Sequence, residues 1–382
     1  MQNNFRLKFE NLPKEAIDLI QLMGSKDKIK SIQAQEALAA LLAPRIGQII
    51  NQIDTTTLVY KDLPYAEDSD PTIPIELFQG VGEAFFSVWS QGAPGGLPTN
   101  EIYQPTREVR FSPYRYDSAV SYSKKFARKA RLDVIAKGFE RLMQEILIKT
   151  NRQGWSVVLA ALANAVHNGI QHVIRTETAG VFDVNSLNKL FTRIRRLNAA
   201  WTKGTPSSEY TTLTDLVISP EIMEQVRSLA YQPVNTKGAN NVTGTQYSGV
   251  VAVPDAERQK IWNNVGTQSL FNVNLIQLDE LGIGYAYNTL FDTAAASTAY
   301  TTASGGSSAA FDAAASEIAI GLDLGREFAW RAIETSDANN NSTFTLNPDN
   351  QFTDRSDKLG FYGAMTLGQI VTNTRPICGL II

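Results

Sequence analysis

The chain has 382 residues, 43% of them hydrophobic and 19% charged, which supplies enough apolar material for about two to three compact units. Its formal net charge of −3 excludes a basic field over the whole protein that would bind nucleic acid. The sequence contains no run of about 18 apolar residues, which a membrane-spanning helix would need. One cysteine and two histidines exclude an internal disulfide framework and a Cys-cluster metal site, and leave almost no candidates for a Ser-His-Asp triad.

Residues 1–80 have the pattern of an N-terminal arm and not of a separate domain. The first residues, Met1-Gln-Asn-Asn-Phe-Arg, lack the charged-then-apolar layout of a signal peptide, so we expect synthesis inside the cell. Apolar spacing predicts a helix over residues 31–53 that Pro44 interrupts, followed by a strand over 55–60. Three prolines and four acids then predict an extended segment over 62–74.

Residues 81–123 are predicted to form a long β-hairpin. Two β-prone stretches, 83–89 and 101–123, flank a tip rich in glycine and proline at 91–98. At about 3.3 Å per residue, arms of this length project on the order of 30–60 Å. A hairpin that long needs a partner surface, which is either a neighbouring molecule or its own domain.

A very long amphipathic helix is predicted over residues 126–167. Apolar residues recur at the helical period from Leu132 to Ile146 and again from Trp155 to Val166, and Gly154 is the place where the helix could kink or split. Some 40 residues give a length of about 60 Å. A basic cluster opens this region, and we interpret it as a solvated helix start in preference to a phosphate-binding patch.

The second half of the chain changes to an α/β texture. A shorter helix over 187–197 has Asp183 or Asn185 as its cap. Residues 292–316 are rich in Ala, Ser, Thr and Gly with almost nothing large to pack, which predicts an exposed insertion. The remaining predictions are strands at 213–219, 249–253, 271–277, 359–363, 368–372 and 377–382, and a helix at 220–230.

The residues that usually carry chemistry form no recognisable site. His167 and His172 are five residues apart, which on one helix would put them on different faces, so surface or interface histidines are favoured over metal ligands. Cys378 lies in an apolar terminal strand and is predicted to be an inert core thiol. We therefore assign no catalytic, cofactor-binding or metal-binding residue. A pair of carboxylates among the 38 acids is still possible, so an acid-based, carbohydrate-active enzyme stays open.

The order of these parts resembles the major capsid proteins of tailed bacteriophages, which have the Hong Kong 97-type fold. Three stretches carry the resemblance besides the order: Tyr116-Asp-Ser-Ala-Val-Ser-Tyr122, Thr214-Asp-Leu-Val-Ile-Ser-Pro-Glu221, and Asp357-Lys-Leu-Gly-Phe-Tyr-Gly through Thr374-Arg-Pro-Ile-Cys378. The likeness covers most of residues 30–382 and implies an α+β fold.

The resemblance also implies a division into parts. These are an N-terminal arm (1–80), an extended loop (81–123), a peripheral domain with a spine helix (124–204 and 343–374) and an α/β axial domain (205–342 and 375–382) that contains the insertion 292–316. On the extended loop, the residues expected to contact a neighbouring subunit are Phe85, Phe86, Trp89, Gly95, Gly96, Leu97 and Pro98.

The function implied by the resemblance is self-assembly into an icosahedral head shell around double-stranded DNA, with no enzymatic activity and no cofactor. Expected partners are the chain itself, as hexamers and pentamers, then portal, scaffolding and decoration proteins, and packaged DNA through non-specific contacts. The protein would be assembled in the host cytoplasm and reside in the virion, with no membrane contact. An encapsulin-like compartment shell would share the fold and stays an alternative.

Some relatives join a loop lysine covalently to an asparagine with the help of a glutamate. Here no lysine occurs between Lys61 and Lys124, and no acid follows Asp357. Because the reaction needs an amine nucleophile and an acid that takes its proton, we expect a shell without covalent cross-links.

Overall fold

The computed structural model describes residues 14–25, 27–66, 69–74, 108–110, 112–128, 132–167, 169–201, 212–231, 268–325, 327–334, 344–349 and 358–382. They divide into two compact units. Unit 1 comprises residues 1–73, 109–154 and 329–370, and unit 2 comprises 74–108, 155–328 and 371–382. The predicted α+β class is confirmed, because helices flank one five-stranded and one six-stranded sheet.

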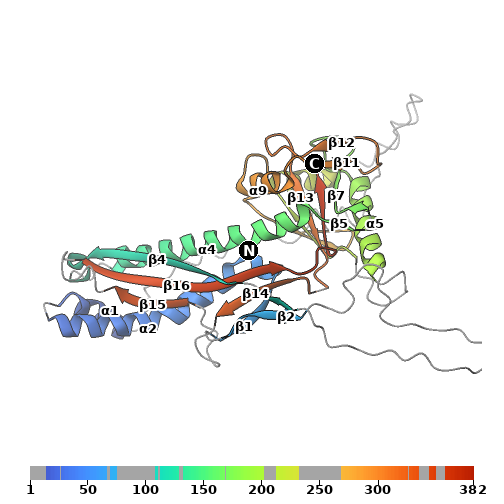
Figure 1. The fold of residues 1–382 in the computed structure, drawn as a ribbon. Helices are drawn as coiled ribbons and strands as arrows, with labels where there is room; N and C mark the ends of the chain where they lie inside the picture. Colours follow the sequence, from blue (N-terminus) through green and yellow to red (C-terminus); the bar gives the residue numbers. More distant parts are fainter. Residues whose placement is uncertain are drawn as a thin grey trace, which may run out of the picture. The chain divides into compact units, whose positions relative to one another are not determined.

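Unit 1 is built on the five-stranded sheet, whose strand order is β1-β14-β16-β15 with β4 also paired to β16 (Figure 1). The strands are β1 (Lys61–Tyr65), β4 (Tyr114–Ser123), β14 (Ala329–Glu334), β15 (Phe344–Asp349) and β16 (Lys358–Val371). The β4–β16 ladder is antiparallel and pairs ten residues of each strand, from Lys358↔Ser123 to Leu367↔Tyr114. The predicted strands at 359–363 and 368–372 are therefore one strand.

Helices α1 (Lys14–Met23) and α2 (Lys28–Ile53) pack into the same core as the first part of α4. Leu38 of α2, Phe139 of α4 and Phe361 of β16 belong to one buried cluster, and the Phe139 and Phe361 rings meet edge to face at 5.3 Å. The prediction that Pro44 interrupts the first helix is wrong. Leu42 and Ile46 are both buried, so tertiary packing on either side holds the helix through the proline.

Residues 55–60 form no strand. Thr55–Leu58 is a short 3-10 helix, η2, because the Asp54 side chain accepts hydrogen bonds from the Thr56 amide and hydroxyl and caps the turn. The predicted long helix corresponds to α3 (Lys124–Arg128) and α4 (Leu132–Ala163), and α4 passes through Gly154 without a break.

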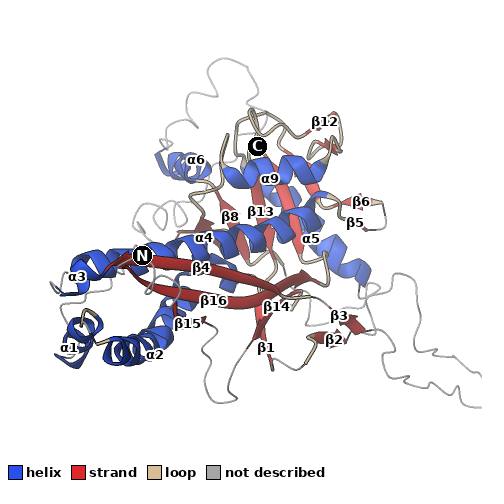
Figure 2. Cartoon of the chain, turned by 60° about the vertical axis from the view of Figure 1, so that its left-hand side comes forward, coloured by secondary structure: helices blue, strands red, loops and turns tan. Residues whose placement is uncertain are grey.

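Unit 2 contains the six-stranded mixed sheet, in the order β7-β17-β13-β8-β10-β9. Figure 2 shows two of its central strands, β8 and β13. The strands are β7 (Val173–Arg175), β8 (Asp215–Ile218), β9 (Gln268–Leu270), β10 (Val273–Gln277), β13 (Ile318–Leu322) and β17 (Ile377–Ile381). Every residue of β8, β13 and β17 is buried, as expected for strands covered on both faces. The predicted strand 249–253 lies outside the described residues.

Helices cover both faces of this sheet. On one face, α5 (Val184–Trp201) and α6 (Pro220–Tyr231) share a buried cluster with the strands, and Asp183 caps α5 as predicted. On the other face, a side chain at Gly379 would meet Leu162 at the end of α4. Nearby in unit 2, α9 (Ala286–Ala295) places Tyr287 against Trp155 at 6.1 Å.

The prediction of an exposed insertion over 292–316 is wrong for its large residues. Tyr300 and Phe311 are buried and both rings contact Phe291, while the Tyr300 hydroxyl donates to the carbonyl of Ala163 at 3.0 Å. The strands β11 (Ala299–Thr301) and β12 (Ser308–Ala310) form a hairpin there. A few aromatic residues therefore anchor a segment whose composition is otherwise small and polar.

Strand pairing places two segments differently from the expected domain ranges. β7 lies within 124–204 but pairs with β17 in the six-stranded sheet. β14 lies within 205–342 but pairs with β1 in the five-stranded sheet. Two small sheets complete the description: β2 (Thr72–Pro74) with β3 (Glu108–Arg110), and β5 (Val166–His167) with β6 (Ile170–Gln171).

Candidate functional site

Strands β2 and β3 pair with each other on either side of residues 75–107. The predicted loop 81–123 extends too far, because β3 lies within it and residues 114–123 form β4, which pairs with β16 in the five-stranded sheet. β2 ends at Pro74 and β3 begins at Glu108, so the chain leaves and returns at one two-stranded sheet. An exposed ion pair between Arg110 Nη1 and Asp70 Oδ2, 3.9 Å apart, lies beside it. The expected contact residues, Phe85, Phe86, Trp89, Gly95, Gly96, Leu97 and Pro98, lie outside the described residues.

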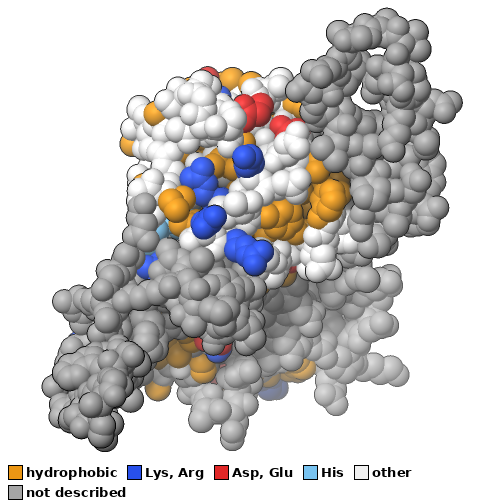
Figure 3. Space-filling view, turned by 90° about the vertical axis from the view of Figure 1, so that its right-hand side faces the viewer, with side chains coloured by type: hydrophobic (Ala, Val, Ile, Leu, Met, Phe, Trp, Pro, Cys, Tyr) orange, Lys and Arg blue, Asp and Glu red, His pale blue; other side chains and the backbone are white. Residues whose placement is uncertain are grey.

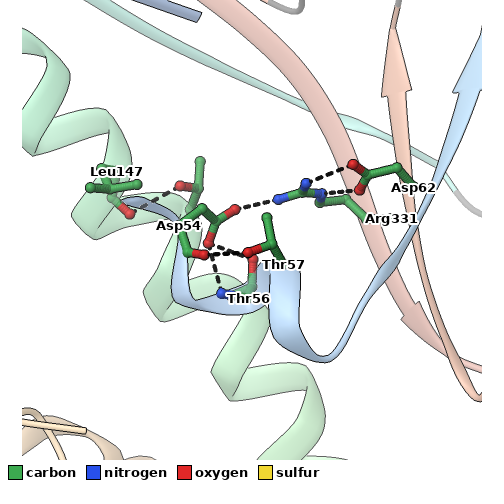
Figure 4. Close-up of polar contacts among 7 residues, drawn as sticks. Asp54, Thr56, Thr57, Asp62, Leu147 and Arg331 are labelled. Atoms are coloured by element: carbon green, nitrogen blue, oxygen red, sulfur yellow. Dashed lines mark hydrogen bonds and ion pairs between the residues drawn. The ribbon is translucent and has the colours of Figure 1, made fainter. Parts of the chain in front are cut away.

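A buried arginine joins the N-terminal segment to the sheet of unit 1 (Figure 4). Arg331 of β14 lies directly opposite Asp62 of β1 in the parallel ladder. Its Nε donates to Asp62 Oδ1 at 2.7 Å and its Nη2 donates to Oδ2 at 3.0 Å, which makes a bidentate pair. The remaining Nη1 donates to Asp54 Oδ2.

Burial makes this triad sensitive to the loss of one partner. The side chains of Arg331 and Asp54 are 3% and 4% exposed, whereas that of Asp62 is 49% exposed. Burial alone would lower the pKa of the Arg331 guanidinium, but the hydrogen bonds and charges of the two aspartates outweigh it and raise that pKa. Arg331 therefore stays charged and holds Asp54 in its capping position.

The next residues of the same segment contact α4. The Tyr60 hydroxyl donates to the backbone carbonyl of Gly154 at 2.8 Å. A side chain at position 154 would come within 2.6 Å of Thr56 and 2.7 Å of Gln369. Glycine is thus required by close approach to η2 and β16, and not by a kink in the helix.

The two histidines of the chain contact each other in unit 2. β5 and β6 form a tight hairpin, and His167 Nδ1 lies 2.8 Å from His172 Nε2. His172 Nδ1 lies 2.7 Å from the carbonyl of Ile377, which can only accept, so this nitrogen carries the proton. His172 Nε2 must then accept from His167 Nδ1, which fixes both neutral tautomers.

The surroundings of this pair favour its neutral form. His172 is fully buried, so the prediction of a surface histidine is wrong for it. Burial chiefly, and then the neighbouring His167, lower the pKa of His172 to about 4, although the bond to Ile377 opposes this. Burial and the charge of Arg375 lower the pKa of His167 as well.

Cys378 is buried in β17 as predicted. Burial first, and the Asp323 carboxylate second, raise the pKa of its thiol, so the thiolate needed for nucleophilic or metal chemistry is disfavoured. Within the described residues, no three His, Cys, Asp or Glu side chains gather as a metal site would require. Among the helices in the described part of the chain, none is long and apolar enough to cross a membrane.

Comparison with known proteins returned structural matches only. No protein-family model and no curated protein matches the chain. Similar solved structures include the holo-SrpI encapsulin complex from Synechococcus elongatus PCC 7942, at 12% identity and TM-score 0.42 over 86% of this chain and 88% of that chain.

Two of the others come from phages. A Microbacterium phage Oxtober96 structure has 9% identity and TM-score 0.47, covering 86% of this chain and 90% of that chain. The capsid of Ralstonia phage GP4 has 12% identity and TM-score 0.45, covering 84% and 86%. At these identities and TM-scores a match by itself establishes neither fold nor function.

Proposed function

We propose that this chain is the major capsid protein of a tailed bacteriophage, with the Hong Kong 97-type fold, and that it assembles into an icosahedral shell around double-stranded DNA. The observation that carries the proposal is the architecture of unit 1. The ten-residue antiparallel ladder of β4 and β16 shares a core with the 32-residue helix α4. Strands β2 and β3 pair with each other at the two ends of residues 75–107. This is the succession of loop, spine helix and sheet that the resemblance implies.

In this proposal the five-stranded sheet and α4 form the peripheral domain, and the six-stranded sheet forms the axial domain. The expected ranges, 124–204 with 343–374 and 205–342 with 375–382, serve as the starting assignment. Strand pairing supports moving β14 to the peripheral domain and β7 to the axial domain.

The extended loop would be the principal contact with a neighbouring subunit. A hairpin that closes at β2–β3 can leave its own domain, and aromatic residues such as Trp89 are the usual anchors of an interface. A head-to-tail contact that closes under rotation would produce hexamers and pentamers. Portal, scaffolding and decoration proteins would be further partners. The protein would act as a structural component of the virion, without catalysis, after assembly in the host cytoplasm.

Electron microscopy and content analysis of purified particles test this proposal. We expect closed shells that contain DNA. Shells that contain a protein cargo and no DNA would favour the encapsulin-like alternative. A monomer on a sizing column, with no shells, would contradict self-assembly and would favour the alternative of an acid-based enzyme.

Deletion of residues 91–98 tests the loop itself. We expect soluble subunits or capsomers and no closed shells, with an unchanged circular dichroism spectrum and unfolding midpoint showing that both units still fold. Normal shells from this variant would rule out the tip as the contact.

The absence of suitable lysines and acids supports a shell held together without covalent bonds. Particles boiled in SDS and reductant should run as one band near 42.0 kDa. A ladder of covalent oligomers would contradict this expectation and would implicate a lysine outside the hairpin, such as Lys61 or Lys124.

A further inference from the structure

Helix α5 carries a concentration of positive charge that no ion pair among the described residues neutralises. Its 18 residues, Val184–Trp201, include Lys189, Arg193, Arg195 and Arg196 and no aspartate or glutamate. By contrast, α4 alternates bases with Glu140 and Glu145. In a chain with a net charge of −3, this local excess requires a separate explanation.

Three of the four basic residues form one stripe. Lys189, Arg193 and Arg196 are spaced i, i+4 and i+7, so they lie on the same side of the helix over about 10 Å. Lys189 and Arg196 are exposed and Arg193 is half-buried. Figure 3 turns the α5 side of unit 2 toward the viewer and shows Lys and Arg side chains gathered on this face.

The charges of this stripe have no acidic partner within the described residues. Ion pairs among the described residues include Lys30–Asp27, Arg110–Asp70, Arg331–Asp54 and Arg331–Asp62, and none of these involves α5. Arg193 Nη1 donates to the backbone carbonyl of Gln171 at 2.7 Å, which fixes the guanidinium without neutralising it. The arrangement is a rigid helix that presents unneutralised cations.

We propose that the α5 stripe of Lys189, Arg193 and Arg196 binds the phosphate backbone of the packaged double-stranded DNA, without sequence preference. This proposal rests on the proposed function, because the DNA that would bind the stripe is the DNA enclosed by the proposed shell. Guanidinium groups match phosphate oxygens in pairs, and evenly spaced cations along a helix suit the regular charge of a duplex. A second copy of the chain that offers acidic side chains to the stripe is the other possible occupant, and the experiment separates the two.

The test measures binding of the unassembled full-length chain to a fluorescent 20-base-pair duplex of mixed sequence, by anisotropy, over a series of salt concentrations. Three phosphate contacts predict a log–log salt slope of about −3. In the double variant Lys189→Gln/Arg196→Gln we expect a slope near −1 and affinity at least about ten-fold lower at low salt, because each lost contact removes about one unit of slope.

A matched control removes the same charge elsewhere. Arg141 and Lys149 are exposed on α4, where acids accompany them, so Arg141→Gln/Lys149→Gln should leave the slope and affinity within two-fold of the parent. Equal loss in both double variants would mean that only net charge matters and would overturn the assignment to α5. No salt-dependent binding by the parent chain would overturn it too.

Shell formation by the same variants is scored in parallel by electron microscopy. Shells from the parent together with an unchanged duplex affinity in the α5 variant would retain the proposed function and reject this inference. If the α5 variant forms no shells while its duplex binding is unchanged, the stripe contacts another subunit and the DNA assignment is wrong. Absence of shells from the parent chain would reject the proposed function, whereas the salt slopes would still decide whether α5 binds a duplex.

Discussion

The two units bury their sheets in different ways. In unit 1, the residues of β4 are exposed or half-buried apart from Tyr122, and Tyr114 is 62% exposed. On this open side Tyr362 donates to Asp117 and accepts from Arg115. In unit 2, every residue of β8, β13 and β17 is buried. The central strands of unit 2 are thus covered on both faces, whereas β4 of unit 1 leaves one side exposed.

Their buried polar groups differ as well. Unit 1 buries the cation of Arg331 between two carboxylates, so its stability depends on opposite charges that stay paired. Unit 2 holds a neutral histidine pair, of which His172 is buried, near Arg193 and Arg375. Its stability therefore depends on these histidines remaining unprotonated. Different perturbations should therefore destabilise the two units, and the following experiments test that difference.

Arg331→Met should produce the largest effect. It removes the guanidinium and leaves Asp54 buried without its partner, which costs about 3–5 kcal/mol of unfolding free energy. Denaturant unfolding of the unassembled subunit measures the loss, and hydrogen exchange should show it in unit 1 before unit 2. Equal loss of protection in both units would contradict their independence.

Asp62→Asn is the matched control. Asp62 is half-exposed and pairs with the same arginine, so the change should cost about 1 kcal/mol or less. A cost as large as that of Arg331→Met would mean that the exposed half of the triad carries the stability.

Phe311→Ala tests whether the small-residue segment of unit 2 is part of its core. The ring is buried against Phe291, so we expect a loss of about 3 kcal/mol in denaturant unfolding. Ser308→Ala, at an exposed position of the same hairpin, should change stability by less than about 0.5 kcal/mol. Similar stability of both variants would restore the interpretation of an exposed insertion.

Long periodic elements were predictable from the sequence. The long helix and the strands around 215–218, 273–277 and 377–381 follow from apolar spacing over many residues. Errors arose where a single residue was given more weight than its tertiary setting. Pro44 does not end its helix, and the few aromatic residues of 292–316 are enough to bury that segment.

The polar clusters were harder to predict from the sequence. The Asn168-Gly169 dipeptide is a strong hairpin signal, and the β5–β6 hairpin brings His167 next to His172. The turn chemistry could therefore have revealed the pair. No comparable signal joins Arg331 to Asp62, because these residues are far apart in the chain and meet only through a parallel ladder.

Gly154→Ala tests the close approach of α4 and η2. Alanine favours a helix by up to about 1 kcal/mol, but its methyl group would overlap Thr56 and Gln369, which costs about 1–3 kcal/mol. We expect a net loss of up to about 2 kcal/mol in unit 1. Gly138→Ala in the same helix meets only a Val120 methyl group at 3.2 Å, so it should be close to neutral. A stabilising Gly154→Ala would show that η2 does not constrain the helix.

Mild acid should weaken unit 2 by the smallest of these amounts. In the folded state the pKa of His172 is about 4, below its ordinary value of 6.5, so the unfolded chain binds the proton first as the pH falls. Stability is therefore complete above about pH 6.5 and declines toward pH 4, with about 1 kcal/mol lost by pH 5.5. His167 acts in the same direction, because its pKa is also lowered.

Unfolding free energies of the unassembled subunit at pH 7.5, 6.5 and 5.5 measure the decline, and His172→Gln should reduce its slope because the titrating group is gone. The two arginines near the pair stay charged throughout this range, so they oppose protonation without titrating themselves. Equal stability at pH 7.5 and 5.5 in the parent chain, or an unchanged slope in the variant, would show that the buried pair does not make unit 2 sensitive to acid.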